Sequence, residues 1–158
     1  MKKYVQDLRV AAIEFPREGY VLLKLQPLQG LLPEMKPGQF VEVQVKNSPT
    51  TFLRRPISIN FVDYDTNELW LLVHAIGDGT RSMAASKVGD IINCVYPLGN
   101  GFTMPETDGR KVLLVGGGVG TAPMPYFGKL LREAGCEPIF LLGGRTRSDL
   151  MQLDLFEQ

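Results

Sequence analysis

Short runs of alternating apolar and polar residues fill the first hundred positions of the chain. In the clearest run, VEVQV, the side chains of Val41, Val43 and Val45 are expected to face inward, because successive residues of a strand point to opposite faces. Segments rich in turn-forming residues, such as PREG, MKPG and DYDTN, separate these runs. Six strands at this spacing predict an all-β, closed antiparallel barrel. We expect its strands at 5–15, 20–26, 39–46, 56–62, 69–75 and 91–96.

One segment within this region has helical spacing. The stretch GDGTRSMAASK carries Met83 and Ala84 after a glycine turn, and either Asp78 or Thr80 can cap a helix here. We place this short helix at one mouth of the barrel.

From Arg110 onward the pattern changes to continuous apolar runs. KVLLVGGG and PIFLLGG are typical of buried parallel strands, and the segment between them has helical spacing that ends at Gly135. A complete doubly wound nucleotide domain needs about 100 residues or more. We therefore predict a barrel domain at 1–103, followed at 110–158 by an incomplete Rossmann-like unit. Its helix, around 126–134, is expected to cover only one face of the sheet.

The composition argues against several kinds of binding partner. The 158 residues are 44% hydrophobic and 22% charged, and 17 basic residues balance 17 acidic ones, so neither nucleic acid nor an anionic membrane is an expected partner. No apolar run approaches the roughly 18 to 20 residues of a membrane span, and no signal-type segment is apparent, so we expect a cytoplasmic protein. Two cysteines, Cys94 and Cys136, are read as reduced structural thiols and not as metal ligands.

The segment RRPISI carries the first candidate chemistry. Pro56 donates no ladder hydrogen bond and restrains Arg55 to an extended conformation, which suits the start of a strand. Alternation predicts Arg55, Ile57 and Ile59 on one face, with Ser58 and Asn60 on the other. An arginine and a hydroxyl held on one strand can fix a phosphate and a ring heteroatom.

Three glycine-rich segments follow. GGGVGTAP comes after a predicted strand and opens a predicted helix, the setting in which backbone N–H groups approach a phosphate, although a tight turn without a ligand has the same pattern. AIGDGT precedes the short helix and is equally compatible with a plain turn. PLGNGF suits a linker or a close backbone approach.

Other polar candidates have simpler explanations. His74 is the only histidine and has no nucleophile motif to serve, so hydrolase chemistry and a catalytic side chain are not expected. Trp70 is expected in the core, and Asp149 and Arg145 are expected at a helix cap in preference to a nucleotide ribose.

Taken together, RRPISI, GDGT, PLGNGF and VGGGVGTAP resemble the ferredoxin reductase-like flavoproteins, and within them the electron-transfer subunits of class B dihydroorotate dehydrogenase. The resemblance implies a Greek-key barrel that binds FAD, with the arginine of RRPISI at the pyrophosphate. It also implies a glycine loop that binds NAD(H). His74 stands where the family commonly has a longer basic side chain. The implied cofactor-binding residues are Arg55, Pro56, Ile57, Ser58, Leu72, Val73, His74, Gly79, Thr80, Gly116, Gly117, Gly118, Gly120 and Thr121.

The same resemblance implies a function in pyrimidine biosynthesis. Electrons from NADH would pass through FAD and a 2Fe-2S cluster to the FMN of a dihydroorotate dehydrogenase catalytic subunit in a hetero-oligomer. The cluster is expected only in the full-length family, because this chain has too few cysteines for it. The alternatives are a related reductase subunit of a hydrogenase, sulfide dehydrogenase or glutamate synthase system, a flavin-binding module without activity, and a nucleotide-free interaction domain.

Overall fold

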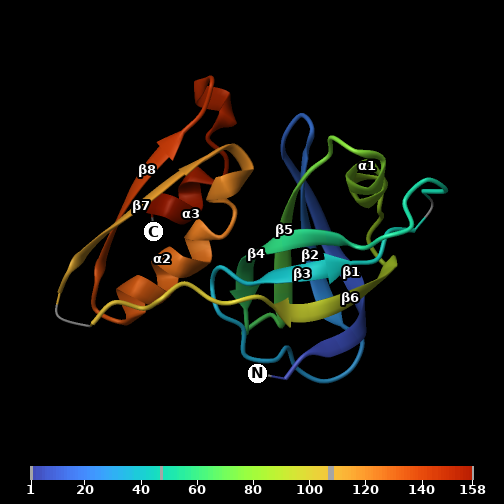
Figure 1. The fold of residues 1–158 in the computed structure, drawn as a ribbon, viewed down its shortest axis with the longest axis horizontal. Helices are drawn as coiled ribbons and strands as arrows, with labels where there is room; N and C mark the ends of the chain where they lie inside the picture. The colour runs from blue at the N-terminus through green and yellow to red at the C-terminus, as the bar shows by residue number, and fades with distance from the viewer. Residues whose placement is uncertain (1, 47, 107–108, 158) are drawn as a thin grey trace.

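The computed structural model describes residues 2–46, 48–106 and 109–157 (Figure 1). The predicted domains 1–103 and 110–158 include Met1 and Gln158, which lie outside the described residues. Its first part holds six strands and one helix, and its second part holds two strands, two helices and two short 3₁₀ turns. In chain order the elements are β1 Tyr4–Arg17, β2 Tyr20–Pro27, β3 Phe40–Val43, β4 Arg55–Asp63, β5 Glu68–His74, α1 Asp78–Ala84, β6 Ile91–Leu98, β7 Lys111–Gly117, the first 3₁₀ turn Gly118–Thr121, α2 Met124–Glu133, β8 Glu137–Gly143, the second 3₁₀ turn Arg147–Asp149 and α3 Leu153–Glu157.

The first six strands close into an antiparallel barrel, in the order β1-β2-β5-β4-β3-β6. This confirms the predicted barrel. One predicted strand is too long, because β3 ends at Val43 and not at residue 46. Beyond Val43 the Gln44 N–H still donates to the Asn93 carbonyl of β6 at 2.9 Å. The chain then runs beside α1, where a methyl group of Val45 lies 3.2 Å from the position of a Cβ built on Gly79.

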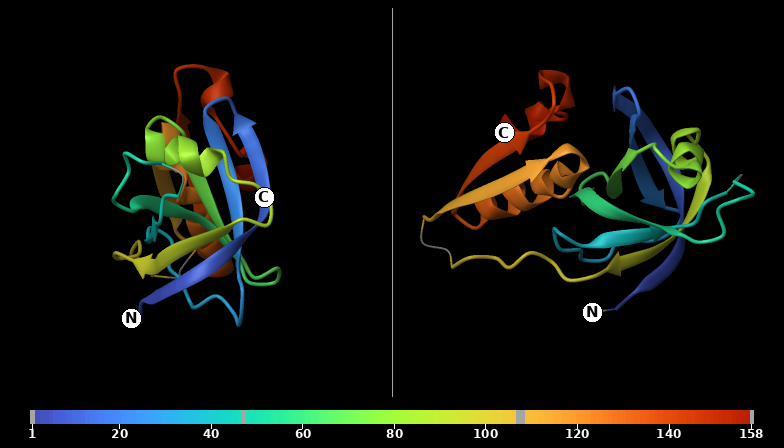
Figure 2. Two further views of the ribbon diagram at one scale, coloured as in Figure 1. Left: turned by 90° about the vertical axis from the view of Figure 1, so that its right-hand side faces the viewer. Right: turned by 45° about the horizontal axis from the view of Figure 1, so that its top comes forward.

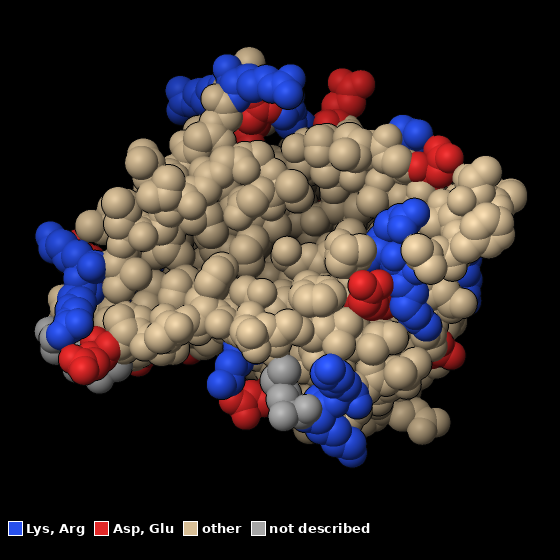
Figure 3. Space-filling view, viewed as in Figure 1, with Lys and Arg blue, Asp and Glu red and all other residues tan. Residues whose placement is uncertain are grey.

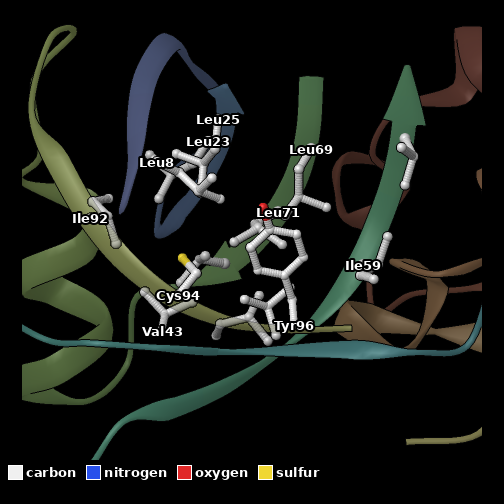
Figure 4. Close-up of a cluster of buried hydrophobic side chains, with 14 of the residues drawn as sticks. Leu8, Leu23, Leu25, Val43, Ile59, Leu69, Leu71, Ile92, Cys94 and Tyr96 are labelled. Carbon is white, nitrogen blue, oxygen red and sulfur yellow. The ribbon is translucent and has the colours of Figure 1, made fainter. Parts of the chain in front are cut away.

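The barrel interior is filled by the inward half of the alternating pattern (Figure 4). Val41 and Val43 are fully buried there, as predicted. Tyr96 is also fully buried, and its hydroxyl donates a hydrogen bond to Gln6 Oε1 at 2.7 Å, so its polar group is not left unpaired. The side chains around it include Leu8, Leu23, Leu25, Ile59, Leu69, Leu71, Ile92 and Cys94.

Helix α1 covers one end of this core, because Met83 is buried among the barrel side chains. The prediction that Asp78 or Thr80 is its N-cap is wrong, since the cap residue is Gly77. Thr80 instead reaches back from the third helical position, and its Oγ1 accepts a hydrogen bond from the Gly77 N–H at 3.0 Å.

The second part, which we call the α/β unit, contains two parallel strands with α2 on one face (Figure 2). Gly128 of α2 packs so closely on β8 that a Cβ there would lie 2.4 Å from the ring of Phe140. The helix starts two residues earlier than predicted, because Pro123 and Pro125 fit its first turn, and Gly135 stops it as predicted. On the opposite face Leu113, Val115, Ile139 and Leu141 are 41–65% exposed.

The barrel and the α/β unit are joined by aromatic and polar contacts. The Tyr126 hydroxyl of α2 donates a hydrogen bond to the Met35 carbonyl at 2.9 Å, and burial raises the pKa of Tyr126 far above its ordinary value. The ring centres of Phe102 and Phe127 lie 4.9 Å apart. In the connection that leads from the barrel to the α/β unit, Gly99 packs against the ring of Phe40 and Gly101 against the side chain of Lys36, with no room for a Cβ at either glycine. PLGNGF therefore makes a close backbone approach as well as serving as a connection.

Candidate functional site

A pocket of about 320 Å³ lies where the start of β4 meets the start of α1, and we call it the Arg55 pocket. Gly79 makes this meeting possible, because a Cβ there would lie 3.2 Å from Arg55 Nε and 3.1 Å from a methyl carbon of Thr51. The pocket is lined by Thr50, Thr51, Arg55, Ile76, Gly77, Asp78, Gly79 and Thr80.

The two arginines of RRPISI have different surroundings. Arg54 donates to the carbonyls of Asn93 at 2.9 Å and Glu42 at 3.3 Å, and also to the Asn93 side chain, so it ties β3 to β6. Arg55 is half-buried, and among the described residues the only hydrogen bond of its side chain is one of 3.4 Å to the Arg54 carbonyl. Arg54 is therefore a structural residue, whereas the Arg55 guanidinium is available to an anion.

The acidic residue of the pocket does not cancel this charge. Hydrogen bonds from Arg81 at 3.0 Å and Thr50 at 3.1 Å keep the pKa of Asp78 below its ordinary value. Because Asp78 is paired with Arg81, Arg55 remains the cation that faces the pocket.

A second pocket, of about 540 Å³, lies between the barrel and the α/β unit, and we call it the junction pocket. Figure 3 shows the surface hollowed between these two parts, with charged side chains mainly at the rim of this face. The rings of Tyr20 and His74 stack at 4.1 Å on the barrel side, and Arg17 forms an ion pair with Asp149 across the junction. The lining residues are Arg17, Glu18, Tyr20, His74, Gly118, Val119, Gly144, Arg145 and Asp149.

The predicted site residues are divided between these pockets and their surroundings. Arg55, Gly79 and Thr80 line the Arg55 pocket, and His74 and Gly118 line the junction pocket. Pro56 and Ser58 are exposed on the outer side of β4. Five predicted residues line neither pocket but belong to β4 or β5, which are neighbours in the barrel: Pro56, Ile57, Ser58, Leu72 and Val73.

Three of the predicted residues have buried side chains that are committed to packing. Ile57 and Val73 point into the barrel core, so only their backbone atoms can touch a ligand outside it. Leu72 packs on the outer side of the barrel against Ala122 and Met151 of the α/β unit.

The predicted glycine loop is only partly a loop. Gly116 and Gly117 are the last two residues of β7, whereas Gly118, Gly120 and Thr121 form the 3₁₀ turn that follows. The Thr121 hydroxyl donates to the Gly118 carbonyl at 2.9 Å and so stabilises the turn. A 3₁₀ turn, and not the start of a long helix, therefore faces the junction pocket.

Asp149 caps a helical turn, as its sequence context favours, and it also forms an ion pair with the barrel. Its carboxylate accepts hydrogen bonds from the Thr146 N–H at 2.7 Å and the Thr146 hydroxyl at 3.1 Å, which caps the second 3₁₀ turn. Its ion pair with Arg17 was not foreseen, and neither was the stacking of Tyr20 on His74. The register of β2 and β5 pairs Tyr20 with His74, and this register was the signal that could have revealed the stack.

The closed barrel with an α/β unit on its outer side has the ferredoxin reductase-like fold. The NADH-dependent reduced ferredoxin-NADP oxidoreductase superposes with a TM-score of 0.80 at 29% identity, covering 94% of this chain and 52% of that one. Phthalate dioxygenase reductase, at 23% identity, shares the fold with a TM-score of 0.78 over 98% of this chain and 48% of its own. No protein-family model matches the chain.

Sequence similarity narrows this class to one family. The chain is 38% identical over 152 residues to the dihydroorotate dehydrogenase B (NAD(+)) electron transfer subunit of Shouchella clausii, covering 94% of this chain and 57% of the relative. It is 42% identical over 117 residues to the subunit of the same name from Lysinibacillus sphaericus, covering 73% of this chain and 46% of the relative. The chain is thus a homologue of the dihydroorotate dehydrogenase B electron transfer subunits, and it spans about half of their length.

Across the part of the chain that the structure describes, no helix has both the length and the apolar character needed to span a membrane.

Proposed function

We propose that the Arg55 pocket binds the pyrophosphate of FAD. The observation that carries this proposal is the half-buried Arg55 guanidinium, which faces the pocket with a single long hydrogen bond to a neighbouring carbonyl. A cation removed from water needs a partner, and a pyrophosphate supplies negative charge in a form that a guanidinium binds well. The N–H groups at the start of α1 add donors on the same side.

The outer sides of β4 and β5 would hold the rest of the flavin. Ser58 offers an exposed hydroxyl, and Ile57 and Val73 would contribute backbone groups because their side chains point inward. Pro56, Leu72 and His74 complete the surface. FAD, once bound, supplies the ability to take up electrons in pairs and release them singly, while the chain supplies position and access.

The NAD(H) site is assigned to the turn that follows β7. Gly118 of this turn lines the junction pocket and has a φ of +55°, which glycine adopts without strain, and we expect backbone N–H groups of the turn to approach the phosphates of the nucleotide. A Cβ on Gly117 would lie 3.4 Å from the Gly143 carbonyl, so the carboxyl ends of β7 and β8 are closely spaced. In a parallel sheet, ligands bind at this end of the strands.

On this basis we assign residues 1–103 to an FAD-binding domain and 110–158 to part of a nicotinamide nucleotide domain. The protein would serve pyrimidine biosynthesis in the cytoplasm, as the NADH-dependent electron transfer subunit of a dihydroorotate dehydrogenase whose catalytic subunit carries FMN. A 2Fe-2S cluster belongs to the proposal only for a full-length member of the family. The homology to subunits of that name over 94% of this chain supports this choice of partner.

A reductase that serves a different electron acceptor is the second candidate. The similarity in fold and sequence to the NADH-dependent reduced ferredoxin-NADP oxidoreductase, at 29% identity, favours it. Co-purification of the chain with an FMN-containing catalytic subunit would favour the first candidate, and reduction of ferredoxin without that subunit would favour the second.

Titration with FAD tests the cofactor site, and the neighbouring arginines provide the comparison. Arg55→Ala is expected to weaken FAD binding about ten- to a hundredfold, because a charge-assisted contact contributes about 1.5–3 kcal/mol. Ser58→Ala removes a neutral hydrogen bond of roughly 0.5–1.5 kcal/mol and should weaken it less.

Arg54→Ala and Arg9→Ala are the matched controls. Arg54→Ala is expected to lower the melting temperature, because it removes the contacts that tie β3 to β6. Arg9→Ala removes an exposed arginine from β1 and should change neither property. An Arg55→Ala variant that binds FAD as tightly as the unchanged chain would exclude the Arg55 pocket as the pyrophosphate site.

A further inference from the structure

Asn60 is a fully buried polar residue in the middle of β4, two positions after the exposed Ser58. The register between β4 and β5 shifts between Ile59 and Phe61, so Asn60 lies at a β-bulge. Regular alternation, which points Ile57 and Ile59 into the barrel core, points Asn60 outward. Its primary amide therefore leaves the barrel wall toward the α/β unit, and the bulge changes the alternation only after this position, where Val62 is buried in the core.

The amide of Asn60 is satisfied by two residues of that unit. Its Nδ2 donates to the Ala122 carbonyl at 2.7 Å and to Gln152 Oε1 at 3.0 Å, and its Oδ1 accepts from Gln152 Nε2 at 3.0 Å. Both donors and the acceptor are therefore used. Gln152 has a φ of +56°, so its backbone adopts an unusual conformation where it forms this pair.

The contact with Ala122 reaches the turn that we assign to NAD(H). Ala122 directly follows the 3₁₀ turn Gly118–Thr121, and it is buried against Leu72 and Met151. The turn is closed on itself by the bond from Thr121 to Gly118. Asn60 thus ties one end of the turn to the strand that carries Arg55 and Ser58.

An apolar packing residue could not replace this contact without cost. It would leave the buried Ala122 carbonyl and the Gln152 amide without the partners that they have now, and an unpaired buried polar group is destabilising. An amide also accepts only one arrangement of its donors and acceptor, so it fixes the position of the turn as well as its attachment.

We propose that Asn60 is a positioning residue that sets the placement of the nucleotide turn against the flavin strand. It touches neither pocket, and it acts through Ala122. The assignment of NAD(H) to the turn and of FAD to the strand rests on the function proposed above. The positional part concerns residues of this chain alone and does not depend on a bound cofactor.

The test uses Asn60→Asp, which keeps the size of the side chain but replaces the donor with an acceptor. We expect hydrogen exchange of the amides at 116–122 to become about fivefold or more faster in the cofactor-free chain, because the Ala122 carbonyl loses its buried partner. With FAD added, affinity should stay within about threefold of the unchanged chain, while iodide should quench the fluorescence of the bound flavin more strongly.

Asn67→Asp is the matched control. Asn67 also uses its amide on backbone groups, accepting from the Leu32 N–H at 2.9 Å and donating to the Gly30 carbonyl at 3.1 Å, but these contacts stay within the barrel. This variant should leave the exchange at 116–122 and the quenching of bound flavin unchanged.

Gln152→Gly guards against the possibility that Asn60→Asp does not fold. Glycine adopts the positive φ of this position and removes the amide pair while keeping the contact with Ala122, so an intermediate acceleration of exchange is expected. Unchanged exchange at 116–122 in the variants would overturn the positional role. Faster exchange with unchanged quenching would overturn the placement of the turn against the flavin, and failure of the unchanged chain to bind FAD would refute only the proposed function.

Discussion

The barrel and the α/β unit bury their strands in opposite ways. In the barrel every strand has a neighbour on both sides, and the side chains of one face fill a common interior. Within the described part of the α/β unit, β7 and β8 pair only with each other, and α2 covers one face. Parallel strands are normally covered on both faces, so the α/β unit leaves one face of its sheet uncovered, whereas the barrel encloses its core. The two parts also share a contact, because Tyr126 of α2 is buried among the side chains of the barrel core.

Equivalent truncations in the two cores should show this difference most strongly. Leu25 in the barrel and Leu131 on α2 are both fully buried, and replacing either with alanine is expected to cost about 2–5 kcal/mol. Leu25→Ala should lower the free energy of global unfolding, whereas Leu131→Ala should mainly lower the free energy of local opening at 110–157.

Denaturant titration followed by hydrogen exchange separates these outcomes. Fast exchange confined to the α/β unit of Leu131→Ala would support two levels of stability. A single transition, shifted equally by both substitutions and by every probe, would mean that the two parts unfold together.

The cysteines give a second and smaller measure of the same difference, because each part contains one. Cys94 is fully buried in the barrel, and burial raises the pKa of its thiol to about 12. Cys136 is 6% exposed in the α/β unit. We expect Cys136 to react with a thiol reagent about tenfold or more faster at pH 8, since local opening of the α/β unit exposes it without unfolding the barrel.

The single-cysteine variants Cys94→Ala and Cys136→Ala assign the two rates. Equal rates in the two variants would contradict local opening, because both thiols would then be exposed by the same event.

The uncovered face of β7 and β8 should produce the smallest change in stability. Leu141→Lys, at a position 59% exposed, is expected to change the free energy of unfolding by no more than about 0.5 kcal/mol. It should nevertheless reduce self-association in light scattering, because Leu141 is one of four apolar side chains on this face.

Val5→Lys is the control for that experiment, since Val5 is an exposed apolar residue of β1 in the barrel. A strictly monomeric unchanged chain at all concentrations would show that the face does not drive association.

The sequence was most informative where a residue's environment follows from local periodicity. Alternation predicted the barrel strands, and the continuous apolar runs predicted β7 and β8. The sequence did not indicate Gly77 as the N-cap of α1, because a residue with a side-chain hydroxyl or carboxylate is the commoner cap. Thr80 lies three residues after Gly77, inside the helix, and bonds back to the cap residue. Just beyond the early end of β3, Val45 packs beside Gly79 of α1, a contact that the sequence of β3 does not contain.

The candidate site shows the same limit. Motifs indicated Arg55 and the glycines, because their chemistry is visible in a few consecutive residues. The structural role of Arg54 depends on hydrogen bonds to Asn93, which is 39 positions away in the sequence. The amide pair of Asn60 and Gln152 joins residues that are 92 positions apart. The ion pair of Arg17 with Asp149 likewise joins the two parts of the molecule. Contacts of this kind arise from the tertiary structure and leave no local pattern.

The single tryptophan of the chain lies where these two parts meet. Trp70 is half-buried beside the cluster of Tyr20, Leu22, Leu72, Ala122 and Met151. The Lys24 ammonium lies 4.0 Å from the centre of its ring, and its Nε1 donates to Glu68 at 3.1 Å. Indole fluorescence moves to longer wavelength in water. The emission maximum of Trp70 should therefore lie at a longer wavelength when the α/β unit separates from the barrel, so the docked and separated forms can be distinguished without an added label.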